Sequence, residues 1–231
     1  RMQGGRPWCR VKMAASLDGR TAMESGESQW ITGPHARSDV QRLRARSAAV
    51  VTGAGTVRAD NPRLTVRPEE MGAIGDKALP VSEPLRVVLD RDLTTSPAAA
   101  VISGGGQALV ITTEDALEEH RARTLHEHGA EVVVLAADSN GQPDPAALMD
   151  LLAGRGINEV LVEAGPTLAG ATLEAGIVDE FWLYQAPTFL GSHARPMAAL
   201  PLRRMQDQYR MAVLDRRMVG ADQRLVLQPG P

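Results

Sequence analysis

The chain has 231 residues and a formal net charge of −3, with 25 Lys and Arg against 28 Asp and Glu. This balance disfavours a general nucleic-acid binder, which usually carries a basic face, and no apolar run approaches the ~20 residues that span a bilayer. Its one cysteine, Cys9, excludes an internal disulfide and a Cys-rich metal site, so we expect a cytoplasmic globular protein.

Residues 1–7 are polar and rich in Gly and Pro, and we expect a linker remnant there, followed by one domain over 8–231. Apolar runs predict strands at 8–15, 48–52, 85–89, 108–112, 131–135 and 159–162. Between them, helices are predicted at 35–46, 57–59, 114–128, 145–152 and 165–175, and residues 68–84 have no clear period and are expected to form a loop.

Repeated strand–helix–strand units predict an α/β fold with a mostly parallel sheet and helices on both faces. The pattern changes near the end of the chain. Three further strands are expected at 180–185, 209–214 and 224–227, with no long helix between them. They predict antiparallel strands at one edge of the sheet.

The first predicted strand leads into the most informative segment of the chain, which extends from Lys12 to Thr32. It combines that lysine with the hydroxyls of Ser16, Thr21 and Ser28 and with the large aromatic ring of Trp30. A simple hairpin needs none of these side chains. The mixture suits a polar, flat, phosphorylated ligand.

A second candidate segment begins where the apolar strand at 159–162 ends in Glu163. The following turn, residues 165–171, is rich in small residues and opens a helix, whose N-terminal N–H groups can bind phosphate. Glu163 would lie at the carboxyl end of a strand, where open α/β sheets bind ligands. The structural alternative is a Gly-Pro turn into a packed helix, with Glu163 capping it.

A third segment, residues 52–67, follows another strand end and carries glycines, Thr56, Asp60 and Arg67. Asp60 stands before Asn-Pro, where a simple turn cap is an alternative reading. Arg67 could join Arg44 from the preceding helix, because converging guanidinium groups bind phosphate well. Arg91, after the strand at 85–89, could hold a ribose 2′-phosphate and favour NADP over NAD, or could be an exposed loop residue.

Metal and hydrolase chemistry are not supported by the sequence. Of the five histidines, His120, His126 and His128 lie close together in sequence, but they lack an i, i+4 pairing and have no cysteine nearby. There is no Gly-x-Ser-x-Gly nucleophile elbow. We therefore expect no metal site and no serine hydrolase.

Taken in order, these segments resemble the reductase domain of the bifunctional riboflavin-biosynthesis deaminase–reductases. The resemblance rests on KMAASLDGRTA at 12–22, GESQWIT at 26–32, DVQRLRA at 39–45, TVRADNP at 56–62, LTVR at 64–67 and EAGPTL at 163–168. It implies a dihydrofolate-reductase-like fold, a homodimer, and NADPH-dependent reduction of the ribosyl group of 5-amino-6-(5-phosphoribosylamino)uracil. The family's usual N-terminal zinc deaminase domain, with its His-x-Glu and Pro-Cys-x-x-Cys motifs, is absent from this sequence.

The resemblance also implies roles for individual residues. The residues expected to contact the substrate are Ser28, Arg44, Leu64, Arg67 and Glu163. Those expected to contact NADPH are Ala14, Trp30, Thr56, Asp60, Arg91, Gly165, Pro166, Thr167, Leu168, Ala169, Gly170 and Ala171.

Lys12 and Asp60 are the candidates for polarising the opened sugar or for delivering the proton that accompanies the hydride. Lys12 could instead anchor a ribose hydroxyl. Two rival readings stay open at this stage: another dihydrofolate-reductase-like enzyme acting on a pterin, and a non-catalytic nucleotide-binding module. A hydride-transfer assay separates them.

Overall fold

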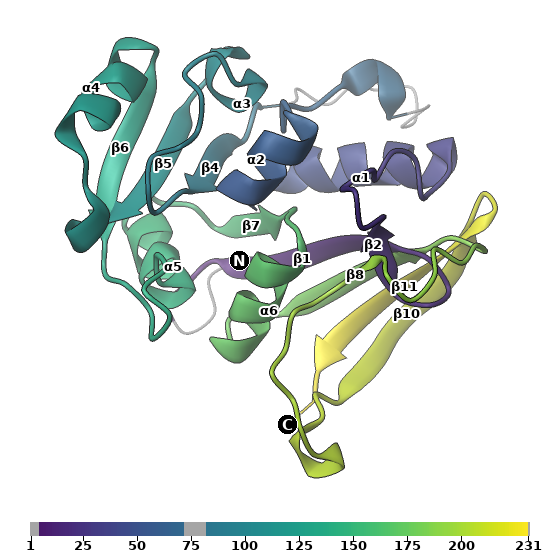
Figure 1. Ribbon diagram of the computed structural model, residues 1–231. Coiled ribbons are helices and arrows are strands. Elements are labelled where there is room, and N and C mark those ends of the chain that lie inside the picture. The colour runs from purple at the N-terminus through teal and green to yellow at the C-terminus, as the bar shows by residue number, and fades with distance from the viewer. Residues whose placement is uncertain (1–4, 72–81, 231) are drawn as a thin grey trace.

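The computed structural model describes residues 5–71 and 82–230. The strands of the main sheet are β1 (Trp8–Ala15), β3 (Ala49–Gly53), β4 (Leu85–Leu89), β5 (Ala108–Thr113), β6 (Ala130–Leu135), β7 (Glu159–Val162), β8 (Glu180–Gln185), β10 (Met211–Val219) and β11 (Asp222–Pro229). Within the described residues they form one sheet of nine strands in the order β10-β11-β8-β1-β7-β3-β4-β5-β6 (Figure 1). The strands from β8 to β6 pair in parallel, and β11 and β10 extend the sheet in antiparallel fashion. The predicted α/β fold is confirmed.

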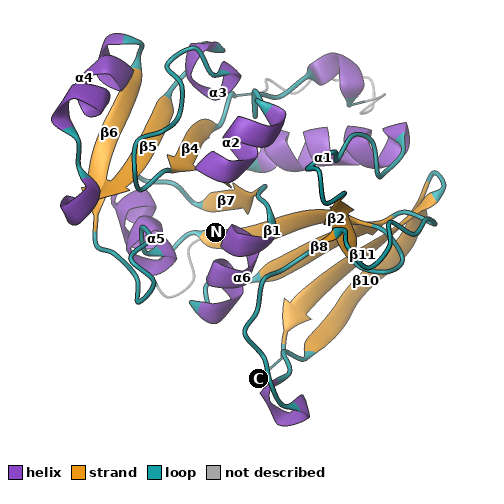
Figure 2. Cartoon of the chain, in the orientation of Figure 1, coloured by secondary structure: helices purple, strands orange, loops and turns teal. Residues whose placement is uncertain are grey.

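Helices cover the sheet on both sides (Figure 2). They are α1 (Pro34–Arg46), α2 (Ala54–Asp60), α3 (Ala100–Ser103), α4 (Glu119–Glu127), α5 (Pro145–Gly154) and α6 (Pro166–Glu174). A proline begins α1, α5 and α6, where its missing N–H costs no hydrogen bond and its fixed φ suits the first turn. Helices α5 and α6 pack on one face, and α1 to α4 contribute to the core on the other.

The alternation of β1 explains how this sheet supplies both a core and a site. Cys9, Val11 and Met13 point to the α5–α6 face and are almost fully buried. The residues between them therefore point to the α1 face, because successive side chains of a strand alternate. Lys12 is one of them, and α1 is the helix that it faces.

Several expected elements need correction. The helix expected at 114–128 is a 3₁₀ turn (Glu114–Ala116) followed by α4, because extended Glu118 interrupts it and its carboxylate caps the N–H groups of His120 and Arg121. The helix expected at 57–59 is the longer α2. The strand expected at 209–214 begins at Met211 instead and runs on to Val219, and with the longer strand that contains 224–227 it forms a hairpin, β10–β11.

Other elements of the model carry little or no sequence signal. The short ribbon formed by β2 (Arg20–Ala22) and β9 (Arg195–Pro196) was not predicted, since it joins distant segments through few residues. A 3₁₀ turn (Pro68–Glu70) begins the loop expected at 68–84, whose residues 72–81 lie outside the described part of the chain. Likewise, residues 1–4 of the expected linker lie outside it.

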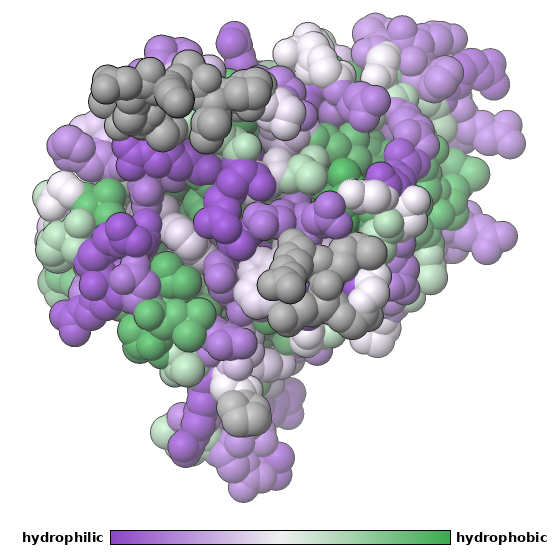
Figure 3. Space-filling model, turned by 180° about the vertical axis from the view of Figure 1, so that it is seen from behind, coloured by the Kyte–Doolittle hydropathy of each residue, from purple (hydrophilic) through white to green (hydrophobic). Residues whose placement is uncertain are grey.

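The face seen from behind carries hydrophilic side chains with separate apolar areas between them (Figure 3). Among the exposed apolar side chains, Val213, Leu214 and Met218 belong to edge strand β10. None of the helices in the described residues is long and apolar enough to cross a membrane.

Candidate active site

A large cavity opens at the carboxyl ends of the central parallel strands, as expected for an open α/β sheet. Its volume is about 1730 Å³, and residues from β1, β3, β4 and the turn after β7 line it. The same cavity receives side chains from α1, α2, the first turn of α6 and the long segment after β1. It is large enough for two ligands of nucleotide size side by side.

Lys12, Glu163 and Arg44 form the charged centre of this cavity. The register that pairs Val11 with Val162 places Lys12 and Glu163 next to each other on neighbouring strands. Arg44 reaches them from α1, with its Nε 2.5 Å from Oε1 of Glu163 and its Nη2 3.0 Å from Oε2. The Nζ of Lys12 lies 3.8 Å from Oε2 of the same carboxylate.

Burial makes the electrostatics of this centre strong. The side chains of Glu163 and Arg44 are 9% and 12% exposed, and that of Lys12 is 20% exposed. Burial opposes ionisation of Glu163, but Arg44 and Lys12 outweigh it and hold the pKa of the carboxyl below its usual value. Burial lowers the pKa of Lys12, with Arg44 acting in the same direction against the opposing carboxylates of Glu163 and Asp60. The ammonium of Lys12 is thus a better proton donor than that of a free lysine.

Two loop contacts close the side of the cavity next to this centre. The hydroxyl of Ser28 donates a 3.0 Å hydrogen bond to Asp60 at the end of α2. The indole of Trp30 is 66% exposed and lies under the guanidinium of Arg37, 4.4 Å from the ring centroid. All four residues line the cavity, so the loop after β1 forms part of its wall.

Arg67 and Leu64 line the cavity from the segment after α2. Leu64 is buried and has a φ of 56°, a left-handed conformation that is uncommon for leucine. Arg67 is bonded to Glu70 at 2.7 Å, and both side chains are about two-fifths exposed. Its charge also acts on Glu163. Arg44 and Arg67 therefore share one cavity, as expected, although Arg44 is bound to Glu163 and the carbonyl of Thr65.

The turn into α6 leaves backbone N–H groups without a side-chain cap. The N–H of Gly165 donates to the hydroxyl of Thr56, and no described side chain caps the helix. Its first-turn N–H groups therefore remain available at the positive end of the helix dipole. Of the predicted cofactor residues, those that line the cavity are Ala14, Trp30, Thr56, Asp60, Arg91, Gly165, Pro166, Thr167, Leu168 and Ala171.

Ala169 and Gly170 do not line the cavity. Ala169 is fully buried in the core, and Gly170 packs against a backbone segment of the same protein. A Cβ built on Gly170 would lie 2.0 Å from the carbonyl oxygen of Ala199. Their small size therefore serves the packing of α6, which positions the first turn of that helix at the cavity.

Several cavity residues had no assigned role in the sequence. Arg58 lies two residues after the predicted Thr56, within the same motif, so its proximity to the site was available as a signal. Arg195, on β9, and the turn of residues 138–144 after β6 carried no such signal because only the folded chain brings them to the cavity. Within residues 5–71 and 82–230, no three His, Cys, Asp or Glu side chains gather in a way that could hold a metal ion.

Comparison with known proteins shows which family the chain resembles. Residues 7–217 match the model of the RibD C-terminal domain. Riboflavin biosynthesis protein RibD of Escherichia coli K12 is 42% identical over 228 residues, which are 96% of this chain and 60% of that protein. Acinetobacter baumannii RibD, form 1, is a solved structure with 37% identity and a TM-score of 0.83 that covers 99% of this chain and 59% of that one.

The alignment with one relative covers almost the whole length of that protein. A 5-amino-6-(5-phosphoribosylamino)uracil reductase of Buchnera aphidicola is 29% identical over 211 residues, which are 90% of this chain and 99% of that protein. By contrast, the chain spans about 60% of the length of the RibD proteins of E. coli and Haemophilus influenzae. The family model covers most of the chain, and this chain belongs to the RibD C-terminal domain family.

Proposed function

We propose that this chain is an NADPH-dependent oxidoreductase of riboflavin biosynthesis. It reduces the ribosyl group of 5-amino-6-(5-phosphoribosylamino)uracil to a ribitylamino group. The observation that carries this proposal is the buried Lys12–Glu163–Arg44 centre at the strand ends, directly beside the uncapped first turn of α6. The name of the almost wholly covered Buchnera relative supports the substrate.

The polar centre suits the substrate. Glu163 is kept ionised by Arg44 and Lys12, so its carboxylate can accept hydrogen bonds from the N–H groups of a pyrimidine or from ribose hydroxyls. Ser28, Arg44 and Arg67 are the proposed contacts of the 5′-phosphate, and Leu64 is a proposed apolar contact. The exposed ion pair between Arg67 and Glu70 contributes little to stability, so a doubly charged phosphate can replace Glu70 as the partner of the Arg67 guanidinium.

The other half of the cavity suits a dinucleotide. The first turn of α6 would hold the pyrophosphate, because its N–H donors and dipole favour an anion. Ala14, Trp30, Thr56 and Asp60 line the same cavity as this turn and the charged centre. When bound, NADPH supplies the hydride, and the protein orients the reacting groups and manages the proton.

Lys12 is our proposed proton donor. Reduction of the ring-opened imine would add hydride to the sugar C1 and a proton to the nitrogen of the same C=N bond, which gives the ribitylamino group. Burial lowers the pKa of Lys12, so its ammonium gives up a proton more readily than a free lysine, and Glu163 holds it in place. Asp60 orients Ser28 and acts electrostatically on Lys12.

The test is oxidation of NADPH, followed by absorbance, with the deaminated ribosylaminopyrimidine phosphate, beside NADH and dihydrofolate. We expect turnover with NADPH and that substrate. Lys12→Arg keeps the charge but gives up its proton far less readily, so we expect KM to hold within about threefold while kcat falls at least ~100-fold. Arg123→Ala, an exposed change on α4, is the control. Turnover of dihydrofolate alone would refute the proposed substrate, and full activity of Lys12→Arg would refute the role of Lys12.

The proposal extends to the assembly of the protein. We propose a cytoplasmic homodimer, and a fused zinc deaminase domain in the longer protein, since the chain spans about 60% of the RibD relatives. Edge strand β10 supports the homodimer, because it exposes 62% of Val213, 53% of Leu214 and 64% of Met218. A monomeric mass by light scattering at micromolar concentration would contradict it.

A further inference from the structure

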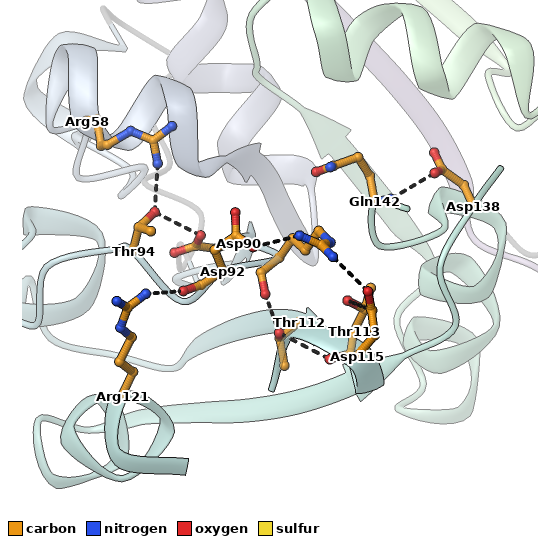
Figure 4. A network of polar contacts seen from close by, with 11 residues as sticks. Arg58, Asp90, Asp92, Thr94, Thr112, Thr113, Asp115, Arg121, Asp138 and Gln142 are labelled. Atoms are coloured by element: carbon orange, nitrogen blue, oxygen red, sulfur yellow. Dashed lines mark hydrogen bonds and ion pairs between the residues drawn. The ribbon is translucent and has the colours of Figure 1, made fainter. Parts of the chain in front are cut away.

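A second cluster of charges lies at the edge of the cavity, away from the proposed chemistry. It surrounds the turn after β4 and contains Arg91, Asp92 and Asp115, with Arg58 reaching the same turn from α2 (Figure 4). Arg58, Arg91 and Asp92 line the cavity. Its two guanidinium groups could meet an additional phosphate of a bound dinucleotide.

The turn itself is fixed by buried hydrogen bonds. Asp90 is 3% exposed and accepts hydrogen bonds from the hydroxyl of Thr94 at 3.1 Å and from the N–H of Thr95 at 2.6 Å. The hydroxyl of Thr112 donates to the carbonyl of Arg91 at 2.5 Å. The backbone of Arg91 is therefore held, and only its side chain is free to change partner.

Two carboxylates hold the guanidinium of Arg91. Its Nη1 lies 2.9 Å from Asp92 and its Nη2 lies 2.7 Å from Asp115. Asp115 is itself fixed, because the hydroxyl of Thr113 donates to its other oxygen at 2.7 Å. One cation thus faces two anions, and the Nε of Arg91 is buried with no hydrogen-bond partner among the described residues. Arg91 has hydrogen-bonding capacity that these partners do not use.

We propose that Asp115, together with Asp92, competes with a coenzyme 2′-phosphate for the guanidinium of Arg91, and that Asp115 thereby sets how strongly this chain prefers NADPH to NADH. The inference rests on the proposed function. It deepens the expectation for Arg91 by assigning a residue that opposes it.

The energetics favour exchange of partners. Asp92 and Asp115 are 60% and 61% exposed, and such exposed ion pairs contribute little net stability. A phosphate offers two charges and several acceptor oxygens, which match the planar guanidinium fork. The phosphate therefore displaces the carboxylates, but the displaced Asp115 stays close, and its charge weakens phosphate binding.

Arg58 completes the arrangement. Its Nη1 donates to the hydroxyl of Thr94 at 2.7 Å, so Thr94 links it to the buried Asp90. On the opposite side, Arg121 of α4 donates to the backbone carbonyl of Asp92 at 2.8 Å. The turn is thus clamped between α2 and α4, as Figure 4 shows for Arg58, Thr94 and Arg121. A rigid turn makes removal of Asp115 a local electrostatic change.

The experiment compares binding of adenosine 2′,5′-bisphosphate and adenosine 5′-monophosphate by titration calorimetry, which needs no catalysis. We expect Arg91→Ala to lower the ratio of the two affinities by about tenfold or more, because a charge-assisted contact to phosphate is lost. We expect Asp115→Asn to raise it by about threefold. Controls of matched charge are Arg123→Ala and Asp150→Asn, which are exposed and do not line the cavity.

The outcomes separate the inference from the proposed function. If Asp115→Asn leaves the ratio unchanged or lowers it, competition by Asp115 is refuted, whatever Arg91→Ala does. An unchanged ratio in Arg91→Ala refutes the role of Arg91. If the unaltered chain binds none of NADPH, adenosine 2′,5′-bisphosphate and adenosine 5′-monophosphate, both the proposed function and the inference are refuted. Far-UV circular dichroism of each variant verifies its fold.

Discussion

The Glu163→Gln substitution tests the electrostatic account of the site without any ligand. Glu163 is 9% exposed and is held by two hydrogen bonds from Arg44 and by Lys12 at 3.8 Å. The neutral amide keeps the shape of the side chain but leaves two buried cations without their counterion. Breaking a buried pair in this way costs about 3–5 kcal/mol, and one remaining acceptor oxygen puts our expectation near the lower end, at about 3 kcal/mol.

The assay is urea unfolding at neutral pH, followed by tryptophan fluorescence and far-UV circular dichroism. The chain offers a matched control, because Arg155 binds both oxygens of Glu131 at 2.5 and 2.8 Å on the surface. Glu131 is 54% exposed, so Glu131→Gln should cost no more than about 1 kcal/mol. Equal losses for Glu163→Gln and Glu131→Gln would refute the argument that burial makes the central pair strong.

Acid provides a second arm of the same test. The pKa of Glu163 lies below its usual 4.5 in the folded chain, because Arg44 and Lys12 outweigh burial. Such a carboxylate stabilises the fold above its unfolded pKa, and this contribution is lost as the pH falls through the folded pKa. The free-energy difference between the unaltered chain and Glu163→Gln should therefore be constant above about pH 5 and shrink below about pH 4.5. A difference that grows in acid would reverse the sign that we assign.

Two further predictions follow from close contacts. Gly170→Ala would place a Cβ 2.0 Å from the carbonyl oxygen of Ala199, so we expect the free energy of unfolding to fall by about 1–3 kcal/mol and Tm to fall by about 3–10 °C. The control is Gly154→Ala, which has no described atom within 4 Å of the new carbon and should leave Tm unchanged or raise it. Equal Tm values for the two variants would refute the contact. Asp18 accepts hydrogen bonds from the hydroxyl of Ser16 and from two backbone N–H groups, and these lower its pKa to about 2. The chemical shift of its carboxyl carbon, followed by NMR, should therefore titrate near that pH. A midpoint near 3.8 would contradict these hydrogen bonds.

The sequence predicted the central sheet because burial on both faces leaves a distinctive pattern. The apolar runs at 85–89 and 159–162 coincide with β4 and β7, since both strands lie between two layers of helices. Sequence pattern gave the wrong result for 114–128, which was predicted as one helix because its charged positions keep a helical spacing through Glu118, where the structure interrupts the helix. A cap is a local hydrogen-bonding choice that hydrophobic spacing does not record.

The resemblance predicted which residues belong to the site, but only the folded structure shows which hydrogen-bond and ion-pair partners they have. Arg44 was expected to bind phosphate with Arg67, and that expectation remains a proposal; the spacing did not indicate that Arg44 also binds Glu163 and the carbonyl of Thr65. Arg91 was expected to meet a 2′-phosphate, and Asp115, the carboxylate that binds its guanidinium at 2.7 Å, lies after a different strand. Ion pairs between distant segments depend on topology, which residue spacing along the chain does not contain.

Strand register is the physical link between the core and the chemistry. Val11 and Val162 are paired and buried, and their burial fixes the register of β1 against β7. That register places Lys12 and Glu163 side by side on the α1 face, where Arg44 completes the charged centre. A slip of one residue would turn Lys12 toward the apolar α5–α6 face and expose Val11 to the site. The hydrophobic pairs that stabilise the sheet therefore also enforce the position of the proposed proton donor, so substitutions that loosen them should impair reduction before they unfold the protein.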